Sequence, residues 1–274
     1  MMKIFSKNVN SIATKTKLPG ADFVINPYIG CTHKCIYCYA EFMNRFTGIK
    51  EPWGDYIVVK NLQGGINRKG LKGKRVLLSS VTDAYQPLNQ KFNKTREILL
   101  QLKDVECNVE ILTKSKYLLK DLDVIKQIPG IKVGVSISTL DDSFRKKIES
   151  GASSVEERIN MLEKLHQEGI ACYLFISPIF PRISDCKSIV ERVKGAVNEI
   201  WFENLNLRGG YKQKVLDLIK RDYPEHLPLY ENIYSGGNSS YWKEIEDDLK
   251  STYAEEFNSG EFKLFFYHSQ IKKG

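Results

Sequence analysis

Three cysteines, Cys31, Cys35 and Cys38, fall within eight residues of this chain with the spacing C-x-x-x-C-x-x-C. The chain has six cysteines, so half of them lie in one short loop. Cysteines clustered this tightly usually bind a metal ion or an iron–sulfur cluster, because thiolates are the ligands that both prefer. Three ligands on a [4Fe-4S] cluster leave one iron open, which suits a site that binds a substrate or a cofactor.

Zinc is the alternative occupant of this loop. A structural zinc site takes four nitrogen or sulfur ligands, and His33 could complete a set with the three cysteines. His33 lies between Cys31 and Cys35 and would have to fold back into the same loop, and the sequence has no second C-x-x-C pair. The zinc hypothesis predicts a non-catalytic nucleic-acid-binding protein, for which the formal net charge of +8 is also suitable.

Six short β-branched or aromatic runs alternate with segments of helical period. Parallel strands need crossover connections, so this alternation favours a parallel sheet. The sequence predicts an α/β fold, a partial (β/α)6 barrel of parallel strands with a C-terminal helical extension, whose site lies at the C-terminal ends of the strands. The expected strands are 23–25, 76–80, 109–113, 132–138, 171–177 and 199–203, and the expected helices are 36–45, 91–102, 118–125, 155–165, 185–194 and 211–222.

We expect one domain over residues 1–274, with a barrel core at about 20–225 and an extension at about 226–274. In the extension, apolar residues recur every four positions from Tyr241 to Phe257 and predict a helix, and 262–267 predicts a last strand. No run reaches the roughly 18 apolar residues that a membrane helix needs, and the N-terminal segment lacks a signal-peptide core. These features predict a cytoplasmic protein without a membrane partner.

The aromatic residue Tyr37 directly before Cys38 makes the loop resemble the radical S-adenosylmethionine (SAM) enzymes. The resemblance implies that Cys31, Cys35 and Cys38 ligate a [4Fe-4S] cluster and that Tyr37 contacts the adenine of SAM. It also implies a reductant such as ferredoxin or flavodoxin, reductive cleavage of SAM, and abstraction of hydrogen from a substrate. In such enzymes the cofactors supply the chemistry and the protein positions them.

Over about residues 22–205 the chain is similar to the branch of this superfamily that contains spore photoproduct lyase. The matching segments are Cys38-Tyr39, Val81-Thr82-Asp83, Thr113-Lys114, Ser136-Ile137, Glu149 with Arg158, and Ser177-Pro178-Ile179. The resemblance makes six residues candidates for the SAM pocket, namely Thr82, Asp83, Lys114, Ser136, Ser138 and Arg158. Asn206, in a polar cluster after the sixth strand, is either a contact to SAM or substrate or a solvated strand end.

One position departs from that branch, whose lyases carry a hydrogen-donating cysteine where this chain has Ser80. A hydroxyl O–H bond is much stronger than a thiol S–H bond, so Ser80 is not expected to replace that cysteine. Tyr39 and Cys172 are the candidate catalytic donors, although Cys172 also suits a buried apolar position. The sequence therefore predicts a radical SAM enzyme whose substrate is not identified, with nucleic acid as one candidate. The alternative is a DNA photoproduct lyase with a non-standard hydrogen donor.

Overall fold

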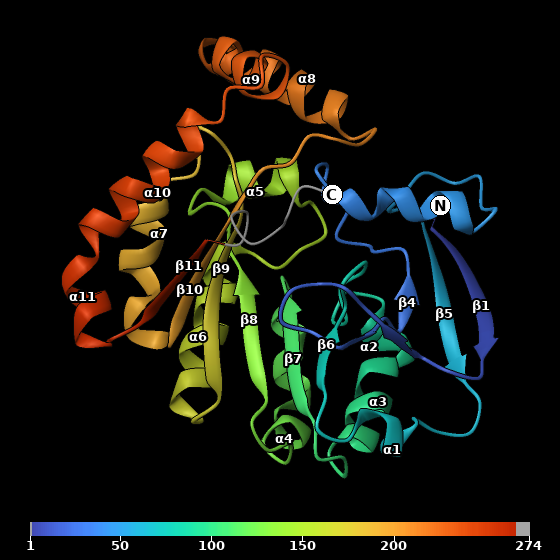
Figure 1. The fold of residues 1–274 in the computed structure, drawn as a ribbon. Coiled ribbons are helices and arrows are strands. Elements are labelled where there is room, and N and C mark those ends of the chain that lie inside the picture. The colour runs from blue at the N-terminus through green and yellow to red at the C-terminus, as the bar shows by residue number, and fades with distance from the viewer. Residues whose placement is uncertain (1, 267–274) are drawn as a thin grey trace.

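The computed structural model describes residues 2–266 and contains an eight-stranded sheet in the order β11-β10-β9-β8-β7-β6-β3-β2. Six consecutive strands in this order are parallel and correspond to the six expected runs (Figure 1). The partial barrel is therefore confirmed. The six strands are β3 (Phe23–Ile25), β6 (Arg75–Leu78), β7 (Asn108–Thr113), β8 (Lys132–Ser136), β9 (Ala171–Ile179) and β10 (Glu199–Asn204).

Two short strands extend the sheet at its edges. β11 (Lys263–Phe266) lies parallel to β10, close to the last strand that the sequence predicts, and Tyr267 lies outside the described residues. β2 (Ala13–Lys15) pairs antiparallel with β3 and was not predicted, because three residues carry no readable alternation. β9 continues past Pro178 to Ile179, and the sheet tolerates this proline where the register with β10 shifts.

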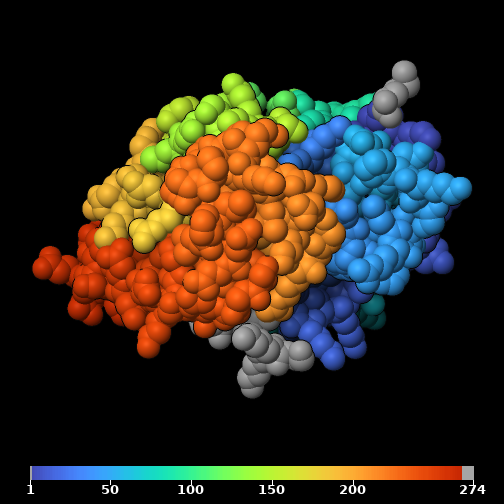
Figure 2. Space-filling model, turned by 90° about the horizontal axis from the view of Figure 1, so that it is seen from above, coloured from blue at the N-terminus to red at the C-terminus, as the bar shows by residue number. Residues whose placement is uncertain are grey.

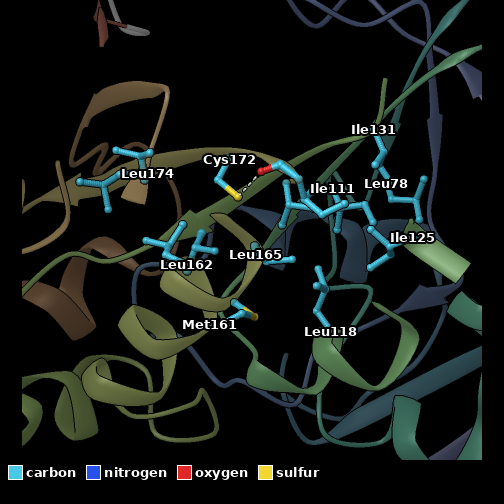
Figure 3. Close-up of a cluster of buried hydrophobic side chains, with 14 of the residues drawn as sticks. Leu78, Ile111, Leu118, Ile125, Ile131, Met161, Leu162, Leu165, Cys172 and Leu174 are labelled. Carbon is cyan, nitrogen blue, oxygen red and sulfur yellow. Dashed lines mark hydrogen bonds between the residues drawn. The ribbon is translucent and has the colours of Figure 1, made fainter. Parts of the chain in front are cut away.

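Helices cover one face of the sheet and enclose the main hydrophobic core (Figures 1 and 3). α6 starts where Ser154 and Glu157 form a capping box and is followed by Gly169 at φ +72°. The expected helix 91–102 is interrupted at Asn93, which has φ +54°. The covering elements are α1 (Arg68–Leu71), α2 (Asn89–Phe92), α3 (Lys94–Leu102), η2 (Lys116–Asp121), α4 (Leu122–Ile125), α6 (Val155–Gln167), α7 (Cys186–Val193) and η3 (Lys194–Ala196).

A second, three-stranded sheet in the order β1-β5-β4 flanks the start of the cysteine loop. Its members are β1 (Lys3–Val9), β5 (Tyr56–Leu62) and β4 (Tyr28–Ile29). The sequence does not predict β1, the parallel partner of β5, because its side chains are nearly all exposed and lack the pattern of a half-buried strand.

The C-terminal helices form two groups. α8 (Lys212–Asp222), η4 (Pro224–His226) and α9 (Leu227–Tyr234) lie over the C-terminal ends of the strands, seen in orange in Figures 1 and 2. α10 (Ser240–Thr252) and α11 (Ala254–Ser259) follow beside α7, so the expected helix 241–257 is broken near Tyr253. Leu249 and Tyr253 belong to the main core, and the single-domain organisation remains a prediction.

A smaller core lies under α8 and α9 and includes residues of the cysteine loop. Phe144 of α5 (Asp142–Ile148) and Phe180 pack there with residues of α8 and α9, and Ile36 and Tyr37 lie against them. The helices above the barrel mouth thus hold one side of the cysteine loop. Between residues 2 and 266, no helix has both the length and the apolar character needed to cross a membrane.

Candidate functional site

Backbone hydrogen bonds fix the cysteine loop to the segment that follows α5. The N–H of Ile36 donates to the carbonyl of Ile148 at 3.0 Å, and the N–H of Gly151 donates to the carbonyl of His33 at 2.9 Å. Cys35 and Glu149 form an antiparallel bridge between these two contacts. The helix after the loop, η1 (Tyr39–Phe46), therefore starts three residues later than the expected residue 36, and it is a 3₁₀ helix.

The three thiols of the loop lie close together without a disulfide. Burial raises the pKa of each thiol, and the pKa of Cys31 is raised further by the nearby Asp83 carboxylate and by the other two cysteines. Cys31 is 9% exposed, whereas Cys35 and Cys38 are half-buried. A metal centre at this loop must displace protons from the thiols as it binds.

This donor set fits a [4Fe-4S] cluster with an open iron. Within residues 2–266, the three thiols of the loop are free of disulfides and can serve as its three protein ligands. Nε2 of the buried His33 also has no hydrogen-bond partner in this part of the chain, and such an atom is costly unless a bound group satisfies it.

A buried ion pair lies directly behind the loop. Nη2 of Arg158 is 2.5 Å from Oε2 of Glu149, and both side chains are about 1% exposed. Arg158 also donates to the carbonyls of Ser136 (2.8 Å) and Ser153 (3.0 Å). Burial alone would raise the pKa of Glu149, but the positive charges of Arg158 and Lys114 and two side-chain hydrogen bonds lower it below its usual value. The carboxylate is therefore charged and can accept hydrogen bonds.

Tyr37 links this ion pair to the mouth of the barrel. Its hydroxyl donates to Oε1 of Glu149, and its ring lies edge-on to Phe180 with centroids 5.7 Å apart. Burial raises the pKa of Tyr37 well above its usual value, so the phenol remains a donor. Nζ of Lys114 lies 5.9 Å from the centre of the same ring and forms no ion pair with any other described residue. Lys114 is thus a cation available to a bound anion.

Thr82 and Asp83 connect the loop after β6 to its neighbours. The hydroxyl of Thr82 donates to the carbonyl of Gly30 at 2.6 Å. Asp83 accepts from the N–H of Tyr85 (2.8 Å), the hydroxyl of Thr113 (2.8 Å) and the N–H of Lys114 (2.9 Å), and Nδ1 of His33 lies 3.4 Å from its Oδ2. Asp83 therefore braces the cysteine loop and the end of β7.

Ser136 and Ser138 both face the end of β9, where their hydroxyls donate to the carbonyl of Ser177 at 2.9 Å each. The hydroxyl of Ser177 donates in turn to Oε2 of Glu203 at 2.5 Å. Burial raises the pKa of Glu203, although Ser177 and the charge of Lys114 partly oppose this. Asn206 is exposed, and its side chain makes no hydrogen bond within residues 2–266, so the structure does not bring it into this network.

The two candidate hydrogen donors lie in different environments. Tyr39 is 53% exposed and its hydroxyl donates to the carbonyl of Ser80, whose own hydroxyl accepts from the side chain of Asn26 at 3.3 Å. Cys172 is 1% exposed, packs among aliphatic residues such as Leu174 and donates to the carbonyl of Ile170 at 3.0 Å (Figure 3). Burial raises the pKa of Cys172 to about 12. As the second residue of β9 it lies at the strand end opposite the loop, which does not support a donor role.

Two sets of contacts at the site were not foreseen from the sequence. Arg145 donates to the carbonyls of Glu149 (3.3 Å) and Ala152 (3.1 Å), and Asp142 accepts from Nε of Arg145 at 2.8 Å, so the pair braces the segment that carries Glu149. The sequence indicates only a helix start at Asp141-Asp142. Gln86, fully buried, contacts residues on both sides of Cys31. Neither contact has a local sequence signal, because the partners meet only in the folded chain.

Comparison with known proteins identifies the class of this chain. The model of the Radical SAM superfamily matches residues 25–192, so the chain belongs to that superfamily. Its cofactors are accordingly a [4Fe-4S] cluster and SAM, as the loop indicates. Uncharacterized protein MJ0683 of Methanocaldococcus jannaschii is 41% identical over 218 residues, which cover 79% of this chain and 82% of that protein.

Two further comparisons involve proteins with named activities. Spore photoproduct lyase complexed with dinucleoside spore photoproduct superposes with a TM-score of 0.67 at 18% identity and covers 96% of this chain and 81% of its own. This likeness confirms the shared fold. The Radical SAM Nalpha-GlyT isomerase of Pseudomonas phage M6 is 22% identical, and the match covers 82% of this chain and 48% of the isomerase.

Proposed function

We propose that this protein is an enzyme that holds a [4Fe-4S] cluster on Cys31, Cys35 and Cys38 and uses SAM to abstract hydrogen from a substrate at the barrel mouth. When bound and reduced, these cofactors supply the hydrogen-abstracting radical. The observation that carries the proposal is the attachment of the three-thiol loop to the Glu149 segment at the C-terminal end of the parallel sheet, where barrel sites form.

The side chains behind the loop would orient SAM. Lys114, a cation without an ion pair in the described chain, would bind the carboxylate of SAM, and the ring of Tyr37 would contact its adenine. Arg158 would act indirectly, because it holds Glu149, which in turn fixes the hydroxyl of Tyr37. The other predicted pocket residues are Ser136, Ser138, Thr82, Asp83 and Asn206. The first four would contribute through contacts that shape the strand ends.

The reaction partners are also part of this proposal. An external reductant such as ferredoxin or flavodoxin would reduce the cluster, and the protein would act in the cytoplasm. A nucleic acid is a candidate substrate, supported by the net charge of +8. A DNA photoproduct lyase is less well supported, because Ser80 replaces the donor cysteine and its hydroxyl is engaged by Asn26. That alternative would require Tyr39 as the hydrogen donor.

The proposal is tested by anaerobic reconstitution with iron and sulfide, followed by dithionite and SAM. We expect a brown protein with about four irons per chain that releases 5′-deoxyadenosine and methionine. Cys35→Ala should lose both the iron and the products, whereas the control Cys172→Ala should keep the iron. A wild-type protein that carries an intact cluster and forms no 5′-deoxyadenosine would contradict the enzymatic function, and a colourless protein with one zinc would favour the structural-metal alternative.

A further inference from the structure

One buried amide side chain is hydrogen-bonded to the residues on both sides of the first cysteine of the loop. Gln86 is 0% exposed, and its Oε1 accepts from both the N–H (2.9 Å) and the hydroxyl (3.1 Å) of Thr32. Its Nε2 donates to the carbonyl of Gly30 (3.3 Å) and to the hydroxyl oxygen of Thr82 (3.1 Å). The residues directly before and after Cys31 are therefore attached to the same side chain.

The chemistry of these contacts requires an amide. The N–H of Thr32 needs an acceptor and the carbonyl of Gly30 needs a donor, and a glutamine supplies both from one planar group. A glutamate would place a second acceptor against the Gly30 carbonyl and bury a charge. An apolar residue would leave the buried N–H of Thr32 without its partner, which typically costs about 1–3 kcal/mol.

The backbone of Gly30 and Thr32, the neighbours of Cys31, has little room to shift. Gly30 has φ +92°, and a Cβ at this position would lie 2.4 Å from the carbonyl oxygen of Tyr56. A Cβ on Gly151 would lie 2.1 Å from the carbonyl oxygen of Thr32. Gly30 and Thr32 thus each lie in close contact with a neighbouring backbone, and both are also hydrogen-bonded to Gln86.

The other two cysteines are placed by backbone contacts instead. Cys35 takes part in the bridge to Glu149, and the N–H of Cys38 donates to the carbonyl of Cys35 at 3.2 Å. Such contacts survive most side-chain substitutions. The geometry therefore points to Gln86 as the positioning residue for Cys31: we infer that it holds this thiol ready for the cluster before the cluster binds.

This inference rests on the proposed function and is tested with Gln86→Met, which keeps the shape of the side chain but removes its hydrogen bonds. After anaerobic reconstitution, we expect at least a threefold loss of iron per chain, and a changed electron paramagnetic resonance (EPR) spectrum for the cluster that remains. The matched control is Thr95→Val, because the hydroxyl of Thr95 holds the carbonyl of Ala84 in the same loop without contacting either neighbour of Cys31. The control should keep its iron and the wild-type spectrum.

A second variant tests the inference even if Gln86→Met does not fold. Thr32→Val removes one of the hydrogen bonds to Gln86 and leaves the backbone N–H in place, so it should cause a smaller loss of iron in the same direction. Full iron content and a wild-type spectrum in both Gln86→Met and Thr32→Val would overturn the inference while leaving the proposed function intact. A wild-type protein that binds no cluster would overturn the proposed function as well.

Discussion

Two polar networks lie near opposite ends of the parallel strands, and they differ in how many of their polar groups have partners among the described residues. At the N-terminal end, Lys132 pairs with Glu199 at 3.0 Å and the hydroxyl of Tyr173 donates to Glu110 at 2.6 Å. At the C-terminal end, Arg158 and Glu149 are paired, but Lys114 has no ion pair in residues 2–266 and Nε2 of His33 has no partner.

We call the N-terminal network of Lys132, Glu199, Tyr173, Glu110 and Trp201 the plug. It is structural, whereas the C-terminal network belongs to the candidate site. Trp201 stacks obliquely between Tyr173 and Phe265, with ring centroids 5.3 and 4.9 Å away, and its indole N–H donates to Glu199 at 2.9 Å. Among the described residues, aromatic rings and paired charges thus pack together at the N-terminal end. Within residues 2–266, the C-terminal end leaves charge and hydrogen-bonding capacity unused, as expected for a site that is completed by cofactors.

The largest expected effect is on stability at the C-terminal end. Arg158→Met leaves the Glu149 carboxylate buried without its cation, which should lower the free energy of unfolding by about 3–5 kcal/mol. The variant should also lose SAM cleavage, because Tyr37 is no longer held. Denaturant unfolding of the apoprotein measures the first effect, and a loss below about 1 kcal/mol would show that this ion pair does not organise the site.

Two hydroxyl deletions compare the networks directly. Tyr37→Phe and Tyr173→Phe each remove a hydrogen bond to a carboxylate, and each should cost about 1–3 kcal/mol of stability. Only Tyr37→Phe should also slow the formation of 5′-deoxyadenosine by reconstituted protein. Equal slowing in both variants would remove the distinction between plug and site.

Lys114→Met should separate binding from stability. The amine forms no ion pair with a described residue, and its charge helps to keep Glu149 ionised, so its loss should lower the free energy of unfolding by about 1 kcal/mol, less than the loss of Arg158. If it binds the carboxylate of SAM, the Kd for SAM should rise at least tenfold, which corresponds to about 1.4 kcal/mol. Equilibrium dialysis with labelled SAM measures this, and an unchanged Kd would exclude the proposed contact.

The smallest expected effect is at the plug. The side chains of Lys132 and Glu199 are 31% and 17% exposed, so their pairing is partly screened by solvent. Lys132→Met should therefore cost less than about 1 kcal/mol and leave iron content and SAM binding unchanged. Altered SAM binding would mean that the N-terminal end of the barrel also shapes the site.

The sequence predicts those parts of the structure that local pattern determines. Apolar runs between turns located all six central strands, and the spacing of Cys31, Cys35 and Cys38 located the loop. Contacts between distant segments could not be foreseen in the same way. Tyr37 and Glu149 are 112 positions apart, and Thr32 and Gln86 are 54 apart, so only the folded barrel brings them together.

Two departures have the same physical origin. The start of η1 moved from the expected residue 36 to Tyr39, because the N–H of Ile36 bonds to the carbonyl of Ile148 instead of beginning a helix. The sequence does not predict strand β1, because this strand is stabilised by backbone pairing with β5 and most of its side chains face solvent. In both cases tertiary pairing outweighs local propensity.

We propose that three thiolates hold a cluster whose open iron faces Tyr37 and Lys114. The most direct test is EPR of the reconstituted, dithionite-reduced protein with and without SAM. We expect a reduced [4Fe-4S] signal whose g-values change when SAM is added, because SAM would bind the open iron. A reduced cluster whose spectrum is unaffected by saturating SAM would contradict this proposal.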